Sequence, residues 1–156
     1  MAYEVERKDL EDGYVVTIRM TTSQDQLGAA FQEILPEVDA EILNAGARPA
    51  GPAFAIYHRF GPGPDGVELE AGFPVEQPIP TSGRVNGREL PATFAAVAWH
   101  HGPYEGLSAA YEAVQAWLTE EGLQASGPPW EVYWTGPMDG VPKEEWRTEV
   151  GFPFEE

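Results

Sequence analysis

The residues with the clearest chemical potential lie in the segment Trp130–Trp134, which reads Trp-Glu-Val-Tyr-Trp. Aromatic and β-branched residues favour a strand, and side chains in a strand alternate between its two faces. Trp130 and Trp134 therefore share one face, which we expect to be turned into the core. Glu131 and Tyr133 share the other. A carboxylate among aromatic residues is partly desolvated, which raises its pKa until a bound cation lowers it again.

Aromatic residues beside this carboxylate suit the binding of an organic cation, because the faces of aromatic rings attract cations. We expect Glu131 to lie within reach of Tyr57 and Tyr133. Two alternatives stay open: Glu131 faces water on a surface strand, and the tryptophans, above all Trp99 and Trp134, only fill the core. The candidate ligand-binding residues are Tyr57, Trp99, Tyr104, Trp130, Glu131 and Tyr133.

The histidines and serines do not predict a metal site or a hydrolytic triad. His100 and His101 are neighbours in a predicted strand and point to opposite faces, while His58 is distant in the sequence. The chain has no Cys, which removes disulfides, thiolate nucleophiles and Cys-based zinc sites. Ser108 and Ser126 lack the sequence context of a nucleophile elbow. We expect no metal and no cofactor.

The elements that must position these residues occur twice in the chain. Four segments recur in the same order at a spacing of 76 to 80 residues, and the first copy has four extra residues after Phe31, a stretch that includes Pro36. In the third pair of segments, Ala55 is the counterpart of Glu131, so the carboxylate belongs to one copy only. The matching segments are 14–20 with 94–100, 27–31 with 107–111, 51–57 with 127–133, and 70–74 with 149–153.

Each copy has the pattern strand, strand, helix, strand, strand. Strands are predicted at 3–7, 14–20, 54–60, 67–75, 84–90, 93–100, 130–135 and 146–154. The apolar stripe of the first helix is Leu27, Phe31, Ile34, Val38 and Ile42, and that of the second is Leu107, Tyr111, Val114 and Leu118. Ser23 is the predicted N-cap of the first helix, with Gln26 in the capping-box position. Pro103 begins the second helix, and Gly46 and Gly122 end the two helices.

The repeat predicts an α+β fold in which a strand-helix-strand-strand module is duplicated. Repeat 1 covers 1–77 and repeat 2 covers 83–156, within a single domain over 1–156. One module of this size rarely carries a full core. We therefore expect the copies to form one antiparallel sheet with two helices packed on one face and a ligand groove at the pseudo-two-fold.

Composition narrows the classes of partner. The net charge of −17 disfavours binding to nucleic acid, which depends on Lys and Arg contacts to phosphates. The N-terminus is too charged for a signal peptide, and the apolar run 94–99 is too short to span a bilayer. We expect a cytoplasmic protein that binds neither nucleic acid nor membrane.

The motifs His100–Tyr104 (H-x-G-P-Y), Trp130–Tyr133 (W-E-x-Y) and the closing Thr148–Pro153 resemble the GyrI-like family. That family includes gyrase-inhibitor-like proteins and the effector-binding domains of AraC-type and MerR-type multidrug regulators. The resemblance implies the duplicated strand-helix-strand-strand fold (the SHS2 module). It also implies that Glu131 pairs with a cationic, lipophilic ligand in an aromatic pocket. The implied pocket-lining positions are Tyr57, Tyr104, Trp130 and Tyr133.

Three functions follow from the residues and the resemblance. The first is a stand-alone module that binds a small hydrophobic, cationic organic molecule such as a drug or toxin. The second is a detoxifying hydrolase of cyclopropane-bearing alkylating compounds, in which Glu131 is the general base and Tyr104 or Tyr133 positions or protonates the opening ring. The third is an acidic protein partner of a topoisomerase. We expect no DNA-binding regulator, because the sequence contains no helix-turn-helix or winged helix.

Overall fold

The computed structural model describes residues 3–135 and 139–155. Within these residues the chain forms eight strands, paired antiparallel, and two α-helices, which confirms the predicted α+β class. The chain divides into two compact units. We call Asp12–Pro91 the α1 unit, and Met1–Glu11 together with Ala92–Glu156 the α2 unit.

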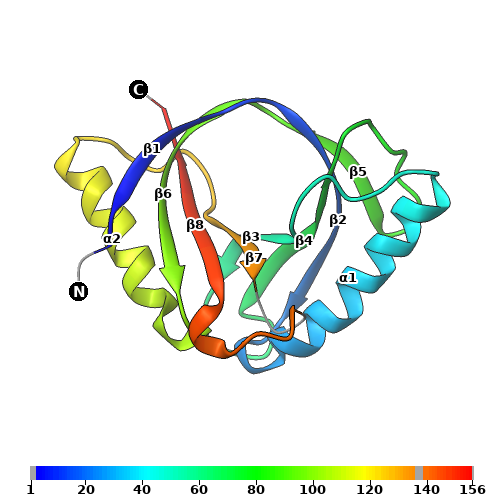
Figure 1. The fold of residues 1–156 in the computed structure, drawn as a ribbon, viewed down its shortest axis with the longest axis horizontal. Helices are drawn as coiled ribbons and strands as arrows, with labels where there is room; N and C mark the ends of the chain where they lie inside the picture. Colours follow the sequence, from blue (N-terminus) through cyan, green and yellow to red (C-terminus); the bar gives the residue numbers. More distant parts are fainter. Residues whose placement is uncertain (1–2, 136–138, 156) are drawn as a thin grey trace. The chain divides into compact units, whose positions relative to one another are not determined.

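The α1 unit has four antiparallel strands in the order β3-β4-β2-β5. Its helix contacts β4, β2 and β5, and Figure 1 shows it running alongside these strands. Four helix residues at helical spacing, Ala30, Ile34, Val38 and Ile42, are buried in this contact. The elements of the unit are β2 (Gly13–Thr22), η1 (Gln24–Gln26), α1 (Leu27–Asn44), β3 (Phe54–Phe60), β4 (Val67–Val75) and β5 (Val85–Leu90).

The α2 unit repeats this arrangement with strands in the order β1-β6-β8-β7. Its helix contacts β6, β8 and β1. The elements of the unit are β1 (Val5–Leu10), β6 (Thr93–His101), η2 (Tyr104–Gly106), α2 (Leu107–Glu120), β7 (Trp130–Thr135), η4 (Lys143–Glu145) and β8 (Arg147–Phe154). The core between helix and sheet contains Ala96, Ala98, Leu107, Ala110, Val114, Leu118, Val150, Phe152 and Phe154.

The edge strand of each unit comes from the other sequence repeat. β1 pairs with β6, and β5 pairs with β2, so neither opening strand forms a hairpin with the strand that follows it. A two-residue hairpin loop needs residues with positive φ, which Gly supplies most readily. The connecting residues are Glu11 and Asp12 in one case and Pro91 and Ala92 in the other, and no described residue other than Gly has positive φ.

The predicted starts of both α-helices are too early, because a short 3-10 turn precedes each helix. Ser23 makes no side-chain capping bond, because the turn η1 intervenes and α1 begins only at Leu27. Pro103 likewise precedes η2, so α2 begins at Leu107. The predicted C-terminal glycines are confirmed. Gly46 and Gly122 have φ of 76° and 71°, the left-handed conformation that ends a helix without steric cost at Gly.

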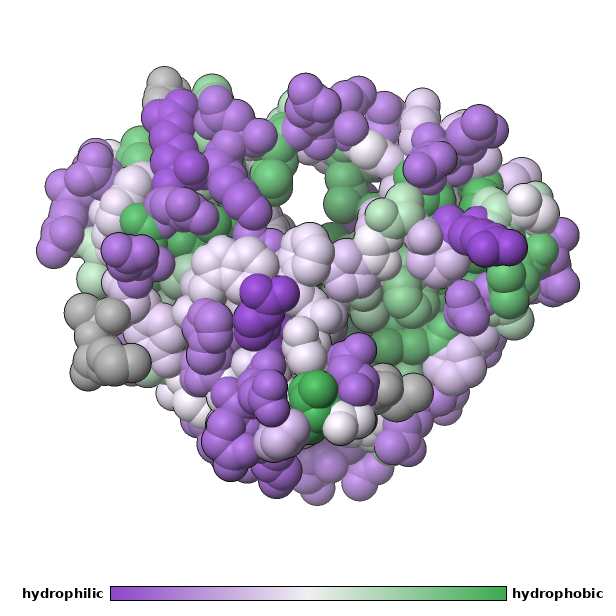
Figure 2. Space-filling model, in the orientation of Figure 1, coloured by the Kyte–Doolittle hydropathy of each residue, from purple (hydrophilic) through white to green (hydrophobic). Residues whose placement is uncertain are grey.

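The visible surface of the protein is largely hydrophilic. Figure 2 shows mostly hydrophilic residues on the visible face of each unit, together with a hydrophobic area beside α1. No helix among residues 3–135 and 139–155 is both long and apolar enough to cross a membrane.

Candidate functional site

The candidate site is built around Glu131, the second residue of β7. In the register of β7 with β8, Glu131 lies opposite Val150, and Val150 packs against α2. Opposed residues of an antiparallel pair share a face, so Glu131 is on the helix-facing side of the sheet. Its exposed fraction is 7%. The prediction that the Glu131 carboxylate is desolvated is therefore confirmed.

Two phenols bind the Glu131 carboxylate. Tyr111 of α2 donates to Oε2 at 2.5 Å, and Tyr133 of β7 donates to Oε1 at 2.7 Å. Burial raises the pKa of Glu131, and it outweighs the two hydrogen bonds and the charge interaction with His100, all of which lower the pKa. The residues that the structure describes offer Glu131 no ion pair. The carboxylate is therefore oriented but not neutralised, and a bound cation would stabilise its ionised form.

Aromatic rings extend from this carboxylate toward η2. The ring of Tyr104 lies 6.0 Å from that of Tyr133 in an edge-on arrangement and 5.0 Å from that of Trp146. Burial raises the pKa of Tyr104 to about 12, with further contributions from the negative charges of Glu131 and Asp139. The Tyr104 phenol therefore stays protonated at neutral pH.

His100 holds the η2 turn, and with it Tyr104, against the sheet. Its Nε2 donates to the carbonyl of Pro103 at 2.8 Å, and its Nδ1 lies 2.8 Å from the Tyr3 hydroxyl. A Cβ on Gly106 would come within 2.7 Å of the imidazole, so only Gly allows η2 to lie this close to His100. His101 is exposed whereas His100 is buried, which agrees with the prediction that the two side chains point to opposite faces.

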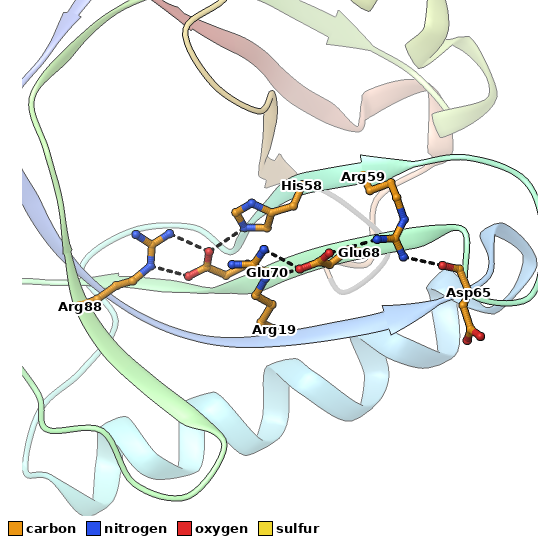
Figure 3. A network of polar contacts seen from close by, with 7 residues as sticks. All are labelled: Arg19, His58, Arg59, Asp65, Glu68, Glu70 and Arg88. Carbon is orange, nitrogen blue, oxygen red and sulfur yellow. Dashed lines mark hydrogen bonds and ion pairs between the residues drawn. The ribbon is translucent and has the colours of Figure 1, made fainter.

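Glu70 in the α1 unit shows what a neutralised buried carboxylate looks like. Figure 3 shows His58 and Arg88 pointing at it, His58 from the neighbouring strand β3 and Arg88 from β5, which is separated from β4 by β2. Arg88 donates to both carboxylate oxygens at 2.7 Å, Thr17 donates at 2.7 Å and His58 at 3.0 Å. Burial alone would raise the pKa of Glu70, but the bonds from Arg88, Thr17 and His58 and the charge of Arg88 lower it to about 2. Glu70 thus has a structural partner of the kind that Glu131 lacks.

The structure brings some of the candidate ligand-binding residues together and separates others. Glu131, Tyr133 and Tyr104 form one cluster. Trp130 and Trp99 lie on the opposite face of the α2 unit's sheet. Trp130 is paired with Gly151 of β8, and its ring packs over that glycine.

The expectation that Trp134 is turned into the core is wrong. Trp134 is 44% exposed, and its ring packs against Trp99 at 5.8 Å and donates to Glu149 at 3.3 Å. Strand alternation correctly places Trp134 on the face opposite Glu131. However, α2 packs on the face that carries Glu131, so the face that carries Trp134 is not covered by the helix. Tyr57 is buried on β3 of the α1 unit, where it packs edge-on against Phe60.

Sequence reasoning missed Tyr111, which it assigned to the apolar stripe of the helix. A signal was present in the repeat. At the equivalent position of the first copy the residue is Phe31, and at the position equivalent to Glu131 it is Ala55. The carboxylate and one of its hydroxyl donors therefore occur in the same copy and are both missing from the other. That joint difference indicates a polar site present in the second copy only.

Solved structures share this fold. The EcmrR C-terminal domain matches with a TM-score of 0.87 at 24% identity, covering 100% of this chain and 99% of that one. In a structure of EcmrR with DNA, the match covers 59% of the EcmrR chain. A hydrolase from Listeria innocua matches with a TM-score of 0.70 at 13% identity, covering 99% of this chain and 93% of that one. SAV2435 bound to tetraphenylphosphonium matches with a TM-score of 0.63 at 15% identity, covering 99% and 94%.

At these identities the likeness to solved structures shows the fold alone. Comparison with curated protein sequences gave no significant match. The model of the GyrI-like small molecule binding domain matches residues 3–155, nearly the whole chain. The chain therefore belongs to the GyrI-like small molecule binding domain family.

Proposed function

We propose that the protein binds a lipophilic organic cation, whose charge is held by Glu131 and whose apolar groups contact Tyr104 and Tyr133. The observation that carries this proposal is the state of Glu131: it is 7% exposed, it is held by two phenols, and it has no ion pair among the described residues. Burying a carboxylate without a counter-ion costs stability. A ligand that supplies the positive charge removes that cost. The neighbouring rings suit the rest of such a ligand.

Two further considerations support a ligand of this class. SAV2435, which shares the fold, is solved with tetraphenylphosphonium, a lipophilic cation. The net charge of −17 raises the concentration of cations near the protein. Of the other residues predicted from the sequence, we leave out Trp99 and Trp130, because they lie on the other face of the α2 unit's sheet.

Tetraphenylphosphonium is expected to bind at least about tenfold more tightly than tetraphenylborate, a nearly isosteric anion, because attraction between two unit charges about 5–11 Å apart contributes roughly 1.5–3 kcal/mol at an effective dielectric constant of about 20. Calorimetric titration of both ions at low and high salt measures this preference. Salt screens attraction to the acidic surface but has less effect on a buried pair, so a preference that survives high salt belongs to the site. Equal affinities of the two ions at high salt would contradict the electrostatic part of the proposal.

The affinity for the cation is also expected to depend on pH. Because burial raises the pKa of Glu131 and a bound cation lowers it, binding releases a proton wherever the ligand-free carboxyl is protonated. The affinity should therefore fall by up to about tenfold per pH unit below the pKa of the ligand-free carboxyl, and be constant above it. Titrations between pH 4.5 and 8 check this, with tetraphenylborate as the control that should show no such loss.

A hydrolase is the second candidate, and the position of Tyr104 favours it. Tyr111 and Tyr133 donate hydrogen bonds to Glu131, whereas Tyr104, a phenol of the same cluster, is not one of these two donors. Its phenol stays protonated at neutral pH, because burial raises its pKa to about 12. Glu131 would take a proton from water as the water oxygen bonds to a strained ring carbon. Tyr104 would protonate the fragment released when the ring bond breaks, and then recover the proton from Glu131.

Incubation with a cyclopropane-bearing alkylating compound separates the two candidates. A hydrolase converts many equivalents of the compound to a ring-opened product that is one water heavier, which mass spectrometry detects. Tyr104→Phe should remove this turnover while the protein still binds tetraphenylphosphonium. Binding without turnover in the unaltered protein would leave the binding module as the function.

A further inference from the structure

Two buried polar atoms beside the Glu131 site have no hydrogen-bond partner among residues 3–135 and 139–155. They are Oγ1 of Thr148 and Nε1 of Trp146. The Thr148 residue is 0% exposed, and Trp146 is partly buried. Buried polar groups in proteins are nearly always hydrogen-bonded, because desolvation without a bond is costly. Two such groups, on residues only two positions apart in the chain, are candidates for bonds that a ligand supplies.

Both groups border the cluster that holds Glu131. Thr148 lies on β8 directly between His100 of β6 and Tyr133 of β7, on the helix-facing side of the sheet. It is two residues along β8 from Val150, the residue opposite Glu131. The Trp146 ring packs against Tyr104 at 5.0 Å, and Tyr104 in turn packs against Tyr133. The two unpartnered atoms therefore belong to the same site as the carboxylate and not to a separate one.

The chemistry of the two groups defines what they would bind. The indole N–H of Trp146 can only donate, so its partner must be an acceptor, and the Thr148 hydroxyl can also donate. One carbonyl oxygen has two lone pairs and can accept from both. An anionic oxygen is disfavoured, because the negative charge of Glu131 is close by.

We infer that the cation bound by Glu131 also carries a neutral, carbonyl-like hydrogen-bond acceptor, which Trp146 and Thr148 bind. This inference rests on the proposed binding function and narrows its ligand class. It predicts that tetraphenylphosphonium, whose substituents are all hydrocarbon, neutralises the charge of Glu131 but leaves Trp146 and Thr148 without an acceptor. A preferred ligand would combine a delocalised positive charge with a ketone, amide or similar oxygen.

The test uses matched pairs of triphenylphosphonium cations. One member carries an acetylphenyl group and the other an isopropenylphenyl group, so that a carbonyl oxygen replaces a methylene of similar shape. Ortho, meta and para isomers of each pair cover different positions of the oxygen. For at least one isomer, the acetyl compound should bind about tenfold more tightly, the size expected when two donors gain an acceptor. Trp146→Phe and Thr148→Val should each reduce this ratio toward one.

The outcomes distinguish this inference from the proposed function. Glu131→Gln should weaken both members of a pair and leave their ratio above one, because it removes the charge and not the donors. Tight binding of phosphonium cations with equal affinity within all three pairs would overturn the acceptor inference and leave the cation site standing. No binding of any of these cations by the unaltered protein would overturn both.

The stability of the unliganded protein gives a second readout that needs no ligand. Thr148→Val keeps the shape of the side chain and removes an unpartnered hydroxyl, so the melting temperature should rise by about 2–4 °C. Val150→Thr, which adds a hydroxyl at the next helix-facing position of β8, should lower it. A fall in melting temperature on Thr148→Val would mean that the hydroxyl is already bonded within the protein, and would overturn the inference.

Discussion

Glu131→Gln is expected to weaken the binding of tetraphenylphosphonium by about 10- to 150-fold, which corresponds to the roughly 1.5–3 kcal/mol of attraction between two unit charges about 5–11 Å apart at an effective dielectric constant of about 20. The amide has the size of the carboxyl group and fits the same place, because the hydroxyls of Tyr111 and Tyr133 can accept as well as donate. The loss therefore reports the charge and not the shape of the site. Calorimetric titration of the two proteins at pH 7.5 measures it.

The matched control is Glu149→Gln. Glu149 is as buried as Glu131, with 5% exposure, but it lies on the opposite face of the α2 unit's sheet and is bound by Lys8 at 2.6 Å. Both substitutions remove one negative charge from the protein, so a general loss of attraction would appear in both. Only Glu131→Gln should affect binding substantially. Equal losses in the two variants would attribute binding to the overall charge and refute the role of Glu131.

The same substitution is expected to stabilise the unliganded protein above the pKa of the folded carboxyl. Burial raises that pKa above its unfolded value, so the folded state holds the proton more tightly, and stability falls as pH rises between the two values. Glu131→Gln has no proton to lose and should lack this fall. Urea unfolding at pH 5 and pH 8 compares the two proteins. Opposite effects on binding and stability indicate that the ligand, rather than the fold, requires the carboxylate.

The fold could be predicted from the sequence largely because the chain contains the same module twice. Each copy supports the assignment of the other, so strands such as Phe54–Phe60 and Val67–Val75 were predicted with their observed bounds. The helix starts were less accessible, because Ser23 has the residue type of an N-cap whether or not a 3-10 turn follows it. The pairing of β1 with β6 was not predicted, because edge-strand pairing depends on the path of the connecting residues and not on periodicity.

The candidate site could be predicted only in part, because its residues depend on how the helix packs on the sheet. Alternation in β7 separates Glu131 and Tyr133 from Trp134, but it does not say which of the two faces the helix covers. The tryptophans were therefore expected in the core, although Trp134 is exposed. Trp146 and Thr148 were not predicted as ligand-binding residues, although Thr148 begins the closing motif of the family resemblance, because an unpartnered buried atom is a property of packing. The difference between Phe31 and Tyr111 was visible, and its meaning became clear only with the hydrogen bond to Glu131.

Arg88→Met is expected to destabilise the protein by about 2 kcal/mol at pH 7. It leaves Glu70 buried with the bonds from Thr17 and His58 but without a full positive charge beside it. Breaking a fully buried pair costs about 3–5 kcal/mol, and we reduce that figure because the Arg88 side chain is 39% exposed and its charge is partly screened by water. Chemical unfolding of the variant measures the loss.

The sequence repeat provides a control for Arg88→Met, and the pH dependence of the loss tests whether it comes from the charge of Arg88. Lys8 occupies the position in β1 that Arg88 occupies in β5, and it binds Glu149 through one contact where Arg88 makes two, so Lys8→Met should cost less than Arg88→Met. Because the pKa of Glu70 is lowered to about 2, its ionised contacts stabilise the fold fully above the unfolded pKa of about 4.3 and are lost as pH falls toward 2. The deficit of Arg88→Met should therefore shrink between pH 5 and pH 3, whereas a deficit that stays constant over this range would assign the effect to lost packing of the arginine stem.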